Sequence, residues 1–166
     1  MSTPAPPRYP DTNLFITGHT PNSTATFFTK TQPESTPVGD GAHINPLYSN
    51  PTSPADITST TIAAPDLIHG TTGSFFTTYD IPPNYIGPQH RSVTVDHVVV
   101  LRGTVVLTLG DGERVELGEG DTVVQRGTMH AWSNESGEWA RLVSVMMPAK
   151  PVVASGGEKL GAVWPF

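Results

Sequence analysis

The sequence contains no cysteine. Disulfide bonds, a thiolate nucleophile and cysteine-ligated metals are therefore excluded, and any bound metal must be held by His, Asp or Glu. Basic residues are also scarce, because 9 Lys and Arg stand against 15 Asp and Glu, which gives a formal net charge of −6. So few positive charges cannot neutralise a run of phosphates or coat an anionic membrane. We therefore expect no nucleic-acid partner and no membrane partner.

Long apolar runs are missing as well. No segment approaches the roughly 18 apolar residues of a membrane helix. The opening residues, Met-Ser-Thr-Pro-Ala-Pro-Pro-Arg, lack the apolar centre of a secretory signal. We expect a soluble, cytoplasmic protein whose 166 residues form one domain with an extended arm.

The signatures of several enzyme classes are absent. The sequence has no phosphate-binding Gly loop, dinucleotide fingerprint, nucleophile elbow or zinc-protease helix motif, so dehydrogenases, kinases and hydrolases all lose support. A sustained helical period of apolar residues is missing too, which leaves strands as the main expected element.

What the chain does have is many short β runs between turns. Ten of its 17 prolines fall in residues 1–60, which we interpret as loops interrupted by a two-stranded arm at 14–17 and 26–29. From about residue 72 the β runs are closely spaced, as in a sandwich or small barrel. The expected strands are 74–79, 92–101, 104–109, 114–117, 122–125, 129–132 and 141–147. We divide the chain into an N-terminal arm (1–70) that packs on the barrel or a partner, a β-barrel (71–152) and a C-terminal tail (153–166).

Histidines are the best candidates for chemistry in a chain without cysteine, because they bind metals and exchange protons near neutral pH. Side chains alternate along a strand, so an unbroken strand from residue 90 places His90, Ser92 and Asp96 on one face and His97 on the other. On a later strand His130 shares a face with Trp132 and Asn134. A barrel that encloses these faces brings two imidazoles and a carboxylate together, which suits a metal or an acid/base site.

The remaining histidines, His19, His43 and His69, have Pro- or Gly-rich surroundings. We expect them at the surface.

The segment from about Gly73 to Pro151 resembles a small single-domain cupin. Gly120-Asp-Thr-Val-Val-Gln-Arg-Gly-Thr-Met-His-Ala-Trp-Ser-Asn134 is similar to the second motif of that family, with His130 at the ligand position. At the places of the first motif, His, His, Glu and Gly, this sequence has His90, Ser92, Asp96 and Gly103. The Thr-Gly-His-Thr stretch at 17–20 also resembles the N-terminal arm of small bacterial and fungal cupins of biosynthetic or catabolic clusters.

The resemblance implies an all-β fold, a double-stranded β-helix or jelly-roll barrel with an extended N-terminal arm. It also implies a small-molecule enzyme with one divalent metal, Fe, Mn, Ni or Zn, on His90, Asp96 and His130. Two departures weaken the metal site, because Ser92 cannot replace an imidazole and Asp96 is shorter than Glu. Three readings of these residues stay open: a metal site, metal-free acid/base catalysis, and a structural cluster.

Other residues are candidates for substrate binding. Trp132 is a possible aromatic wall, Arg126 a partner for a substrate carboxylate, and Gln125 a polar group at the cavity mouth. Ser92 and Asn134 complete this set.

The leading functional hypothesis is a lyase or isomerase of secondary metabolism that decarboxylates, dehydrates or tautomerises an oxygenated organic acid or polyketide-like aromatic. His130 would serve as general acid or base, Asp96 as its proton partner and His90 as a stabiliser of the developing oxyanion. The alternatives are an Fe(II)-dependent dioxygenase and a ligand-binding cupin without catalysis.

We also expect a homodimer, since the arm strands can add to a partner sheet. The aromatic C-terminal residues are expected to dock on the barrel or the partner.

Overall fold

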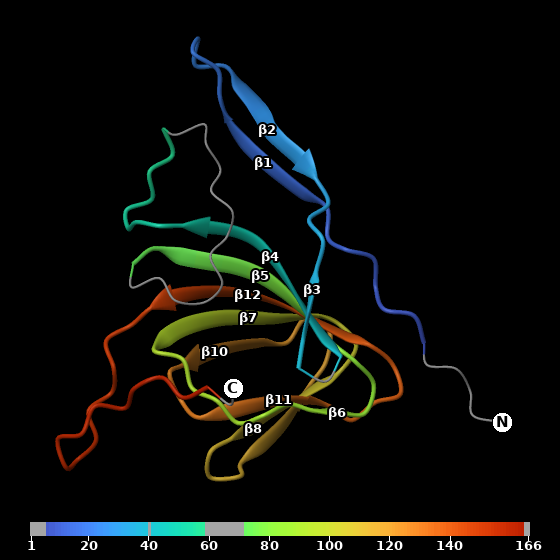
Figure 1. The fold of residues 1–166 in the computed structure, drawn as a ribbon, viewed down its shortest axis with the longest axis vertical. Helices are drawn as coiled ribbons and strands as arrows, with labels where there is room; N and C mark the ends of the chain where they lie inside the picture. The colour runs from blue at the N-terminus through green and yellow to red at the C-terminus, as the bar shows by residue number, and fades with distance from the viewer. Residues whose placement is uncertain (1–5, 40, 59–71, 165–166) are drawn as a thin grey trace.

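The computed structural model describes residues 6–39, 41–58 and 72–164, and these form twelve β-strands. The first two, β1 (Leu14–His19) and β2 (Ala25–Thr31), make an antiparallel hairpin. Figure 1 shows this hairpin extending away from the other strands. Within the described residues, no helix is long and apolar enough to cross a membrane.

The remaining strands form two sheets. The larger sheet has the order β10-β7-β12-β5-β4-β3, and the smaller one has the order β6-β11-β8-β9. The larger sheet contains β3 (Thr36–Val38), β4 (Ala42–Asn50), β5 (Ser74–Ile81), β7 (Thr94–Arg102), β10 (Thr122–Arg126) and β12 (Ala140–Pro148). The smaller sheet contains β6 (Tyr85–Ile86), β8 (Val105–Leu109), β9 (Arg114–Leu117) and β11 (His130–Asn134).

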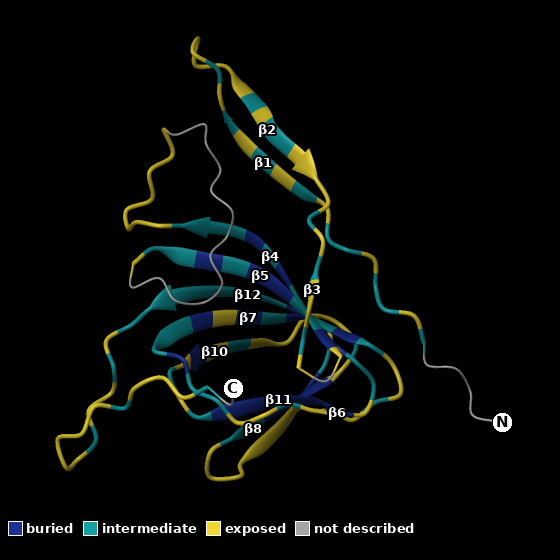
Figure 2. Cartoon of the chain, in the orientation of Figure 1, coloured by how far each residue is buried: buried dark blue, intermediate teal, exposed yellow. Residues whose placement is uncertain are grey.

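The apolar core lies between the two sheets. Val98, Val100 and Leu142 contribute from the larger sheet, and Leu107 and Trp132 from the smaller one. Each of these strands turns one face inward because side chains alternate along a strand. All five residues of β11 are buried, as Figure 2 shows. The predicted all-β barrel is thus confirmed, and each of the nine predicted strands overlaps an observed one.

The strand β4 was not predicted, because Pro46 lies in its middle and proline is rare inside central strands. The structure accommodates Pro46 in two ways. Its neighbour β3 pairs only with residues 42–44, so β4 is an edge strand at Pro46. The pairing of β4 with β5 also shifts register between Pro46 and Tyr48. Residues 36–50 therefore contribute strands to the larger sheet.

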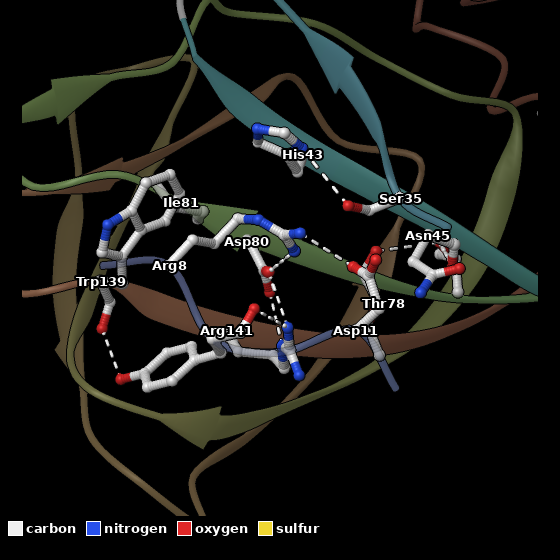
Figure 3. Close-up of polar contacts among 12 residues, drawn as sticks. Arg8, Asp11, Ser35, His43, Asn45, Thr78, Asp80, Ile81, Trp139 and Arg141 are labelled. Atoms are coloured by element: carbon white, nitrogen blue, oxygen red, sulfur yellow. Dashed lines mark hydrogen bonds and ion pairs between the residues drawn. The ribbon is translucent and has the colours of Figure 1, made fainter. Parts of the chain in front are cut away.

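An ionic cluster fixes the N-terminal segment to the larger sheet (Figure 3). Asp80 on β5 is 2% exposed. It accepts hydrogen bonds from Nε and Nη2 of Arg141, on the paired strand β12, at 2.5 and 2.7 Å. Arg8 reaches the same carboxylate at 2.8 Å. The Trp139 indole donates to the carbonyl of Pro6 at 2.9 Å. The segment before β1 is therefore bound to the barrel rather than free.

Gly103 makes the tight connection between β7 and β8. Its φ of +72° lies in the left-handed region, and a Cβ there would meet the carbonyl oxygen of Trp139 at 2.7 Å. Only glycine satisfies both conditions without strain. This explains the glycine of the first motif.

Candidate active site

A cavity of about 460 Å³ opens between the two sheets. It is lined mainly by apolar and aromatic side chains, and its polar side chains include His90, Asp96, Gln125 and His130. Trp132 also lines it. Among the described lining residues there is no Lys or Arg, and Asp96 is the only carboxylate. Such a cavity suits a neutral small molecule whose polar groups are few.

Two histidines forty residues apart in sequence lie side by side in this cavity. The backbones of His90 and His130 form an antiparallel bridge, with two reciprocal N–H to carbonyl hydrogen bonds of 2.9 Å. Directly paired residues of this kind place their side chains on the same face. The ring centroids are 4.3 Å apart, so the two imidazoles are in contact.

The hydrogen bonds of these histidines define their tautomers. Nδ1 of His130 lies 3.0 Å from the carbonyl of Thr128, and Nδ1 of His90 lies 3.1 Å from the carbonyl of Pro88. A carbonyl only accepts, so each Nδ1 carries the proton and each Nε2 is left as an acceptor. Burial, with a smaller effect of the His90 charge, lowers the pKa of His130 to about 4. His130 is therefore neutral at pH 7.

Asp96 is the least satisfied polar group of the site. It is 6% exposed, and its Oδ1 has no hydrogen-bond partner. Burial raises the pKa of the Asp96 carboxyl to about 6, although hydrogen bonds with Thr94 and Ser92 oppose the rise. A buried carboxylate oxygen without a partner is costly, and it points to a ligand as the missing partner.

Ser92 has a supporting position beside Asp96. It is 4% exposed, accepts a 2.6 Å hydrogen bond from the Thr94 hydroxyl, and does not line the cavity. The side chain at the place of the family's second histidine thus lies beside the carboxylate and not in the cavity wall.

The expected unbroken strand from residue 90 is not formed, and this separates the site residues. His90 and Arg91 lie in isolated bridges, and β7 begins only at Thr94 after a bend at Val93. His90 therefore pairs with β11 of the smaller sheet, whereas Asp96 belongs to the larger sheet. The two imidazoles and the carboxylate face the cavity from opposite walls.

The structure does not bring together the three residues that the resemblance implies as metal ligands. In the part of the chain that the structure describes, no three His, Asp or Glu side chains are grouped closely enough to hold a metal ion. His90 and His130 pair with each other at the smaller sheet, whereas Asp96 belongs to β7 of the larger sheet. Metal binding by His90, Asp96 and His130 therefore stays a prediction.

Only some of the predicted substrate-binding residues line the cavity. Trp132 and Gln125 line the cavity. Arg126 is exposed and does not line it, because β10 continues through residue 126 and alternation turns Arg126 outward once Gln125 points inward. Asn134 is fully buried, and its amide donates to the carbonyls of Ile81 and Glu138, so it fixes a turn. The expected contact of Arg126 with a substrate carboxylate is not supported by this placement.

The other histidines lie outside the cavity. His19 and His97 are exposed. His43 is half-buried, against the expectation of a surface position, because its ring packs edge-on against Trp139 at 6.2 Å and its Nδ1 is 3.3 Å from Ser35 Oγ. His69 lies outside the described residues.

The sequence did not assign Tyr79, Tyr85, Ile86 or Trp164 to the cavity, and the structure shows all of them in its lining. Burial and a hydrogen bond with Tyr85 raise the pKa of Tyr79 far above its ordinary value, so this phenol stays neutral. The aromatic C-terminal residues were the available signal for Trp164, but the sequence did not say where they dock.

Two facing sheets that enclose one apolar cavity with a few convergent polar groups form a β-barrel with an internal cavity. The comparisons with known proteins agree. Residues 77–146 match the family model described as "Cupin domain". The chain is 35% identical over 163 residues to phomopsin biosynthesis cluster protein C' of Diaporthe leptostromiformis, covering 91% of this chain and 85% of the relative. The chain belongs to the cupin family.

Further relatives also come from fungi. Oryzines biosynthesis cluster protein J of Aspergillus oryzae is 34% identical over 173 residues, with 93% of this chain and 94% of the relative covered. The cupin-domain-containing oxidoreductase srdB of Neurospora crassa is 31% identical, with 94% and 86% covered. This chain is therefore a small cupin similar to those of fungal biosynthetic clusters.

Solved structures support the fold alone. The cupin domain of Schizosaccharomyces pombe Cnp3 matches with a TM-score of 0.53 and 12% identity, covering 84% of this chain and 89% of that one. The polyketide cyclase RemF of Streptomyces resistomycificus matches with a TM-score of 0.51 and 19% identity, covering 80% of each chain.

Proposed function

We propose that this cupin catalyses proton transfer at carbon, as a lyase or isomerase, on a neutral hydroxylated carbonyl compound of secondary metabolism. One observation carries the proposal: a buried Asp96 carboxylate with an unpartnered oxygen faces the contacting imidazoles of His90 and His130 across an apolar cavity. Membership in a family with relatives in fungal biosynthetic clusters supports the metabolic setting.

Asp96 is the proton carrier in this proposal. A general base is most effective when its pKa lies near the working pH, and burial moves Asp96 toward that range. Its carboxylate takes a proton from the carbon next to the substrate carbonyl. In a tautomerisation, Asp96 returns that proton to another substrate atom; in a dehydration, it gives it to the departing hydroxyl, which leaves as water.

The imidazoles of His90 and His130 orient the substrate. Each presents Nε2 as an acceptor, so a substrate hydroxyl can donate to one of them. This differs from the roles expected from the sequence. An imidazole protonated at Nδ1 has no Nε2 proton to give to an oxyanion, and the low pKa of His130 makes it a weak base.

The residues that line the cavity also favour an uncharged substrate. A substrate carboxylate needs a cation or several donors when it is taken out of water. The described lining residues include neither Lys nor Arg. Dehydration and tautomerisation of neutral compounds are therefore favoured over decarboxylation of an acid.

Hydrogen–deuterium exchange tests the proposal without the natural substrate. The α-protons of 2-tetralone, a neutral bicyclic ketone, are followed by NMR in D₂O under anaerobic conditions with chelator-treated protein. We expect faster exchange with the wild-type protein than with an Asp96→Asn variant, while a His97→Gln control, on the outer face, matches the wild type. Exchange equal to the protein-free rate would contradict the proposal.

An oxidoreductase activity is the second candidate, because relatives carry that name. Oxygen uptake measured with the same ketone and added Fe(II) distinguishes an oxidoreductase from a lyase or isomerase. Uptake that depends on His130, without anaerobic exchange, would favour the second candidate. Binding without exchange or uptake would favour a cupin that only binds its ligand.

A further inference from the structure

The chain returns to the cavity mouth just before its C-terminus. The backbones of Arg91 and Val163 form an antiparallel bridge with hydrogen bonds of 2.9 and 2.8 Å. The Arg91 side chain adds a third bond, from Nε to the carbonyl of Gly161 at 2.8 Å. Figure 1 shows this red segment running back toward β11. Three bonds at one rim position fix the residue that follows Val163.

That residue, Trp164, forms part of the cavity wall. Its ring stacks on His90 with a centroid distance of 5.5 Å and an interplanar angle of 19°. His90 in turn contacts His130, so the Trp164 and His130 rings both pack against it. His90 is thus held by ring contacts and by the Nδ1 bond to Pro88.

The second tryptophan of the cavity has a different orientation. Trp132 meets His130 nearly perpendicularly, with an interplanar angle of 85° and a centroid distance of 6.2 Å. Aromatic pairs favour offset-stacked and edge-to-face contacts, and such contacts require a flat partner. With Trp132 and Trp164 both in the lining, the cavity offers two indoles to a flat ligand beside the imidazole acceptors.

We propose that Trp164 is a specificity-determining residue that selects planar, conjugated, hydroxylated ligands and holds His90 in the orientation that accepts their hydroxyl. The inference rests on the proposed function in placing the substrate in this cavity. It adds the shape of the substrate and gives the C-terminal segment a role in the site.

A pair of ligands with the same bicyclic frame, one flat and one puckered, tests this inference. The probes are 2-naphthol and decahydro-2-naphthol, which share a hydroxyl and a bicyclic carbon frame. Affinities are measured by isothermal titration calorimetry. Because one aromatic contact contributes roughly a factor of three to ten in affinity, we expect the wild-type protein to prefer 2-naphthol by about that factor.

Four variants separate stacking from mere filling of space. Trp164→Leu keeps apolar volume without a flat ring, and its preference for 2-naphthol should fall to the part that Trp132 alone supports. Trp164→Phe keeps a flat ring and should restore most of the preference. Arg91→Ala removes the side-chain hydrogen bond to Gly161 and should reduce part of the preference for 2-naphthol. Val153→Ser, at an exposed site in the same tail, should leave it unchanged.

The outcomes that overturn the inference are specific. The inference is wrong if the wild-type protein shows no preference or does not bind 2-naphthol. It is also wrong if the Trp164→Leu variant keeps the wild-type preference, or if that variant loses affinity for both probes equally. The 2-tetralone exchange reports separately on the chemistry. Lost exchange with a retained Trp164-dependent preference would contradict the proposed reaction and leave the role of Trp164 standing.

Discussion

Asp96 is the residue on which the account depends most. A carboxylate that is buried, partly unpartnered and without a facing cation destabilises the folded state. Proteins keep such groups where function requires them. A substitution of Asp96 should therefore raise the stability of the folded protein and lower its activity.

Asp96→Asn should stabilise the protein at neutral pH. The pKa of Asp96 in the folded state, about 6, lies above the ordinary aspartate pKa of 3.8, so the folded state binds an extra proton between these two pH values. Stability is then lost as the pH rises through that window, and the full cost of about 3 kcal/mol is present above it. Urea unfolding at pH 7 should show a gain of up to about this size, which disappears below pH 4. A loss of stability at pH 7 would show that the carboxylate is satisfied.

His130 should have the opposite pH dependence. The pKa of His130 in the folded state, about 4, lies below the ordinary histidine pKa of 6.5, so the unfolded state binds more protons between these two pH values. Stability should fall as the pH drops through that window, by about 3 kcal/mol in total. His130→Gln should remove this contribution in urea unfolding at pH 7 and pH 4, whereas His97→Gln should not. Equal pH dependence in both variants would contradict the low pKa of His130.

At the scale of single residues, part of the candidate site could be predicted from the sequence. His90, Asp96, His130, Trp132 and Gln125 were selected from residue type, alternation and resemblance, and they line one cavity. Their pairing across sheets was not predictable, because alternation applies only while a strand continues, and this one breaks before Thr94. Trp164 could not be assigned because a tail has no periodicity that fixes its docking site.

At the scale of elements, strands with regular alternation and flanking turns were predictable, whereas β3, β4 and β6 were not. The three residues of β3 and the two of β6 are too short to show a period. The β4 segment contains Pro46, which is tolerated because the strand pairs there with β5 alone and has no second neighbour. Long-range pairing, and not local preference, determines these elements.

The contact between the N-terminal segment and β5 gives a prediction at this scale. Asp80→Asn should lower the free energy of unfolding by about 3 kcal/mol or more, because it leaves Arg8 and Arg141 without their shared carboxylate. Arg114→Gln, which breaks the exposed ion pair with Glu135, should cost less than about 1 kcal/mol. Urea unfolding of both variants measures the difference. Similar small effects would show that the cluster does not fix the segment.

For the whole molecule, the hairpin of β1 and β2 is the feature without an obvious partner in the described chain. Two strands alone are marginally stable in water. Phe15 and Phe27 pack edge-to-face at 6.1 Å but remain 58% and 54% exposed. The expected homodimer, with the hairpin packed on a second copy, would cover these rings.

Light scattering after size-exclusion chromatography tests this expectation. The wild-type protein should have the mass of a dimer, and a Phe15→Ser, Phe27→Ser double variant should shift toward the monomer. Ile57→Ser, at an 81% exposed position outside the hairpin, should not change the mass. A monomeric wild-type protein would exclude the dimer.

The pH dependence of 2-tetralone exchange tests the central claim most directly, because it asks whether Asp96 carries the proton. We predict that the exchange rate of the wild-type protein rises about tenfold per pH unit below pH 6 and levels off above it, as for a base with a pKa near 6. Asp96→Asn should abolish this rise along with the catalysed rate. A profile that is flat between pH 4 and 8, or one that persists in Asp96→Asn, would contradict the account.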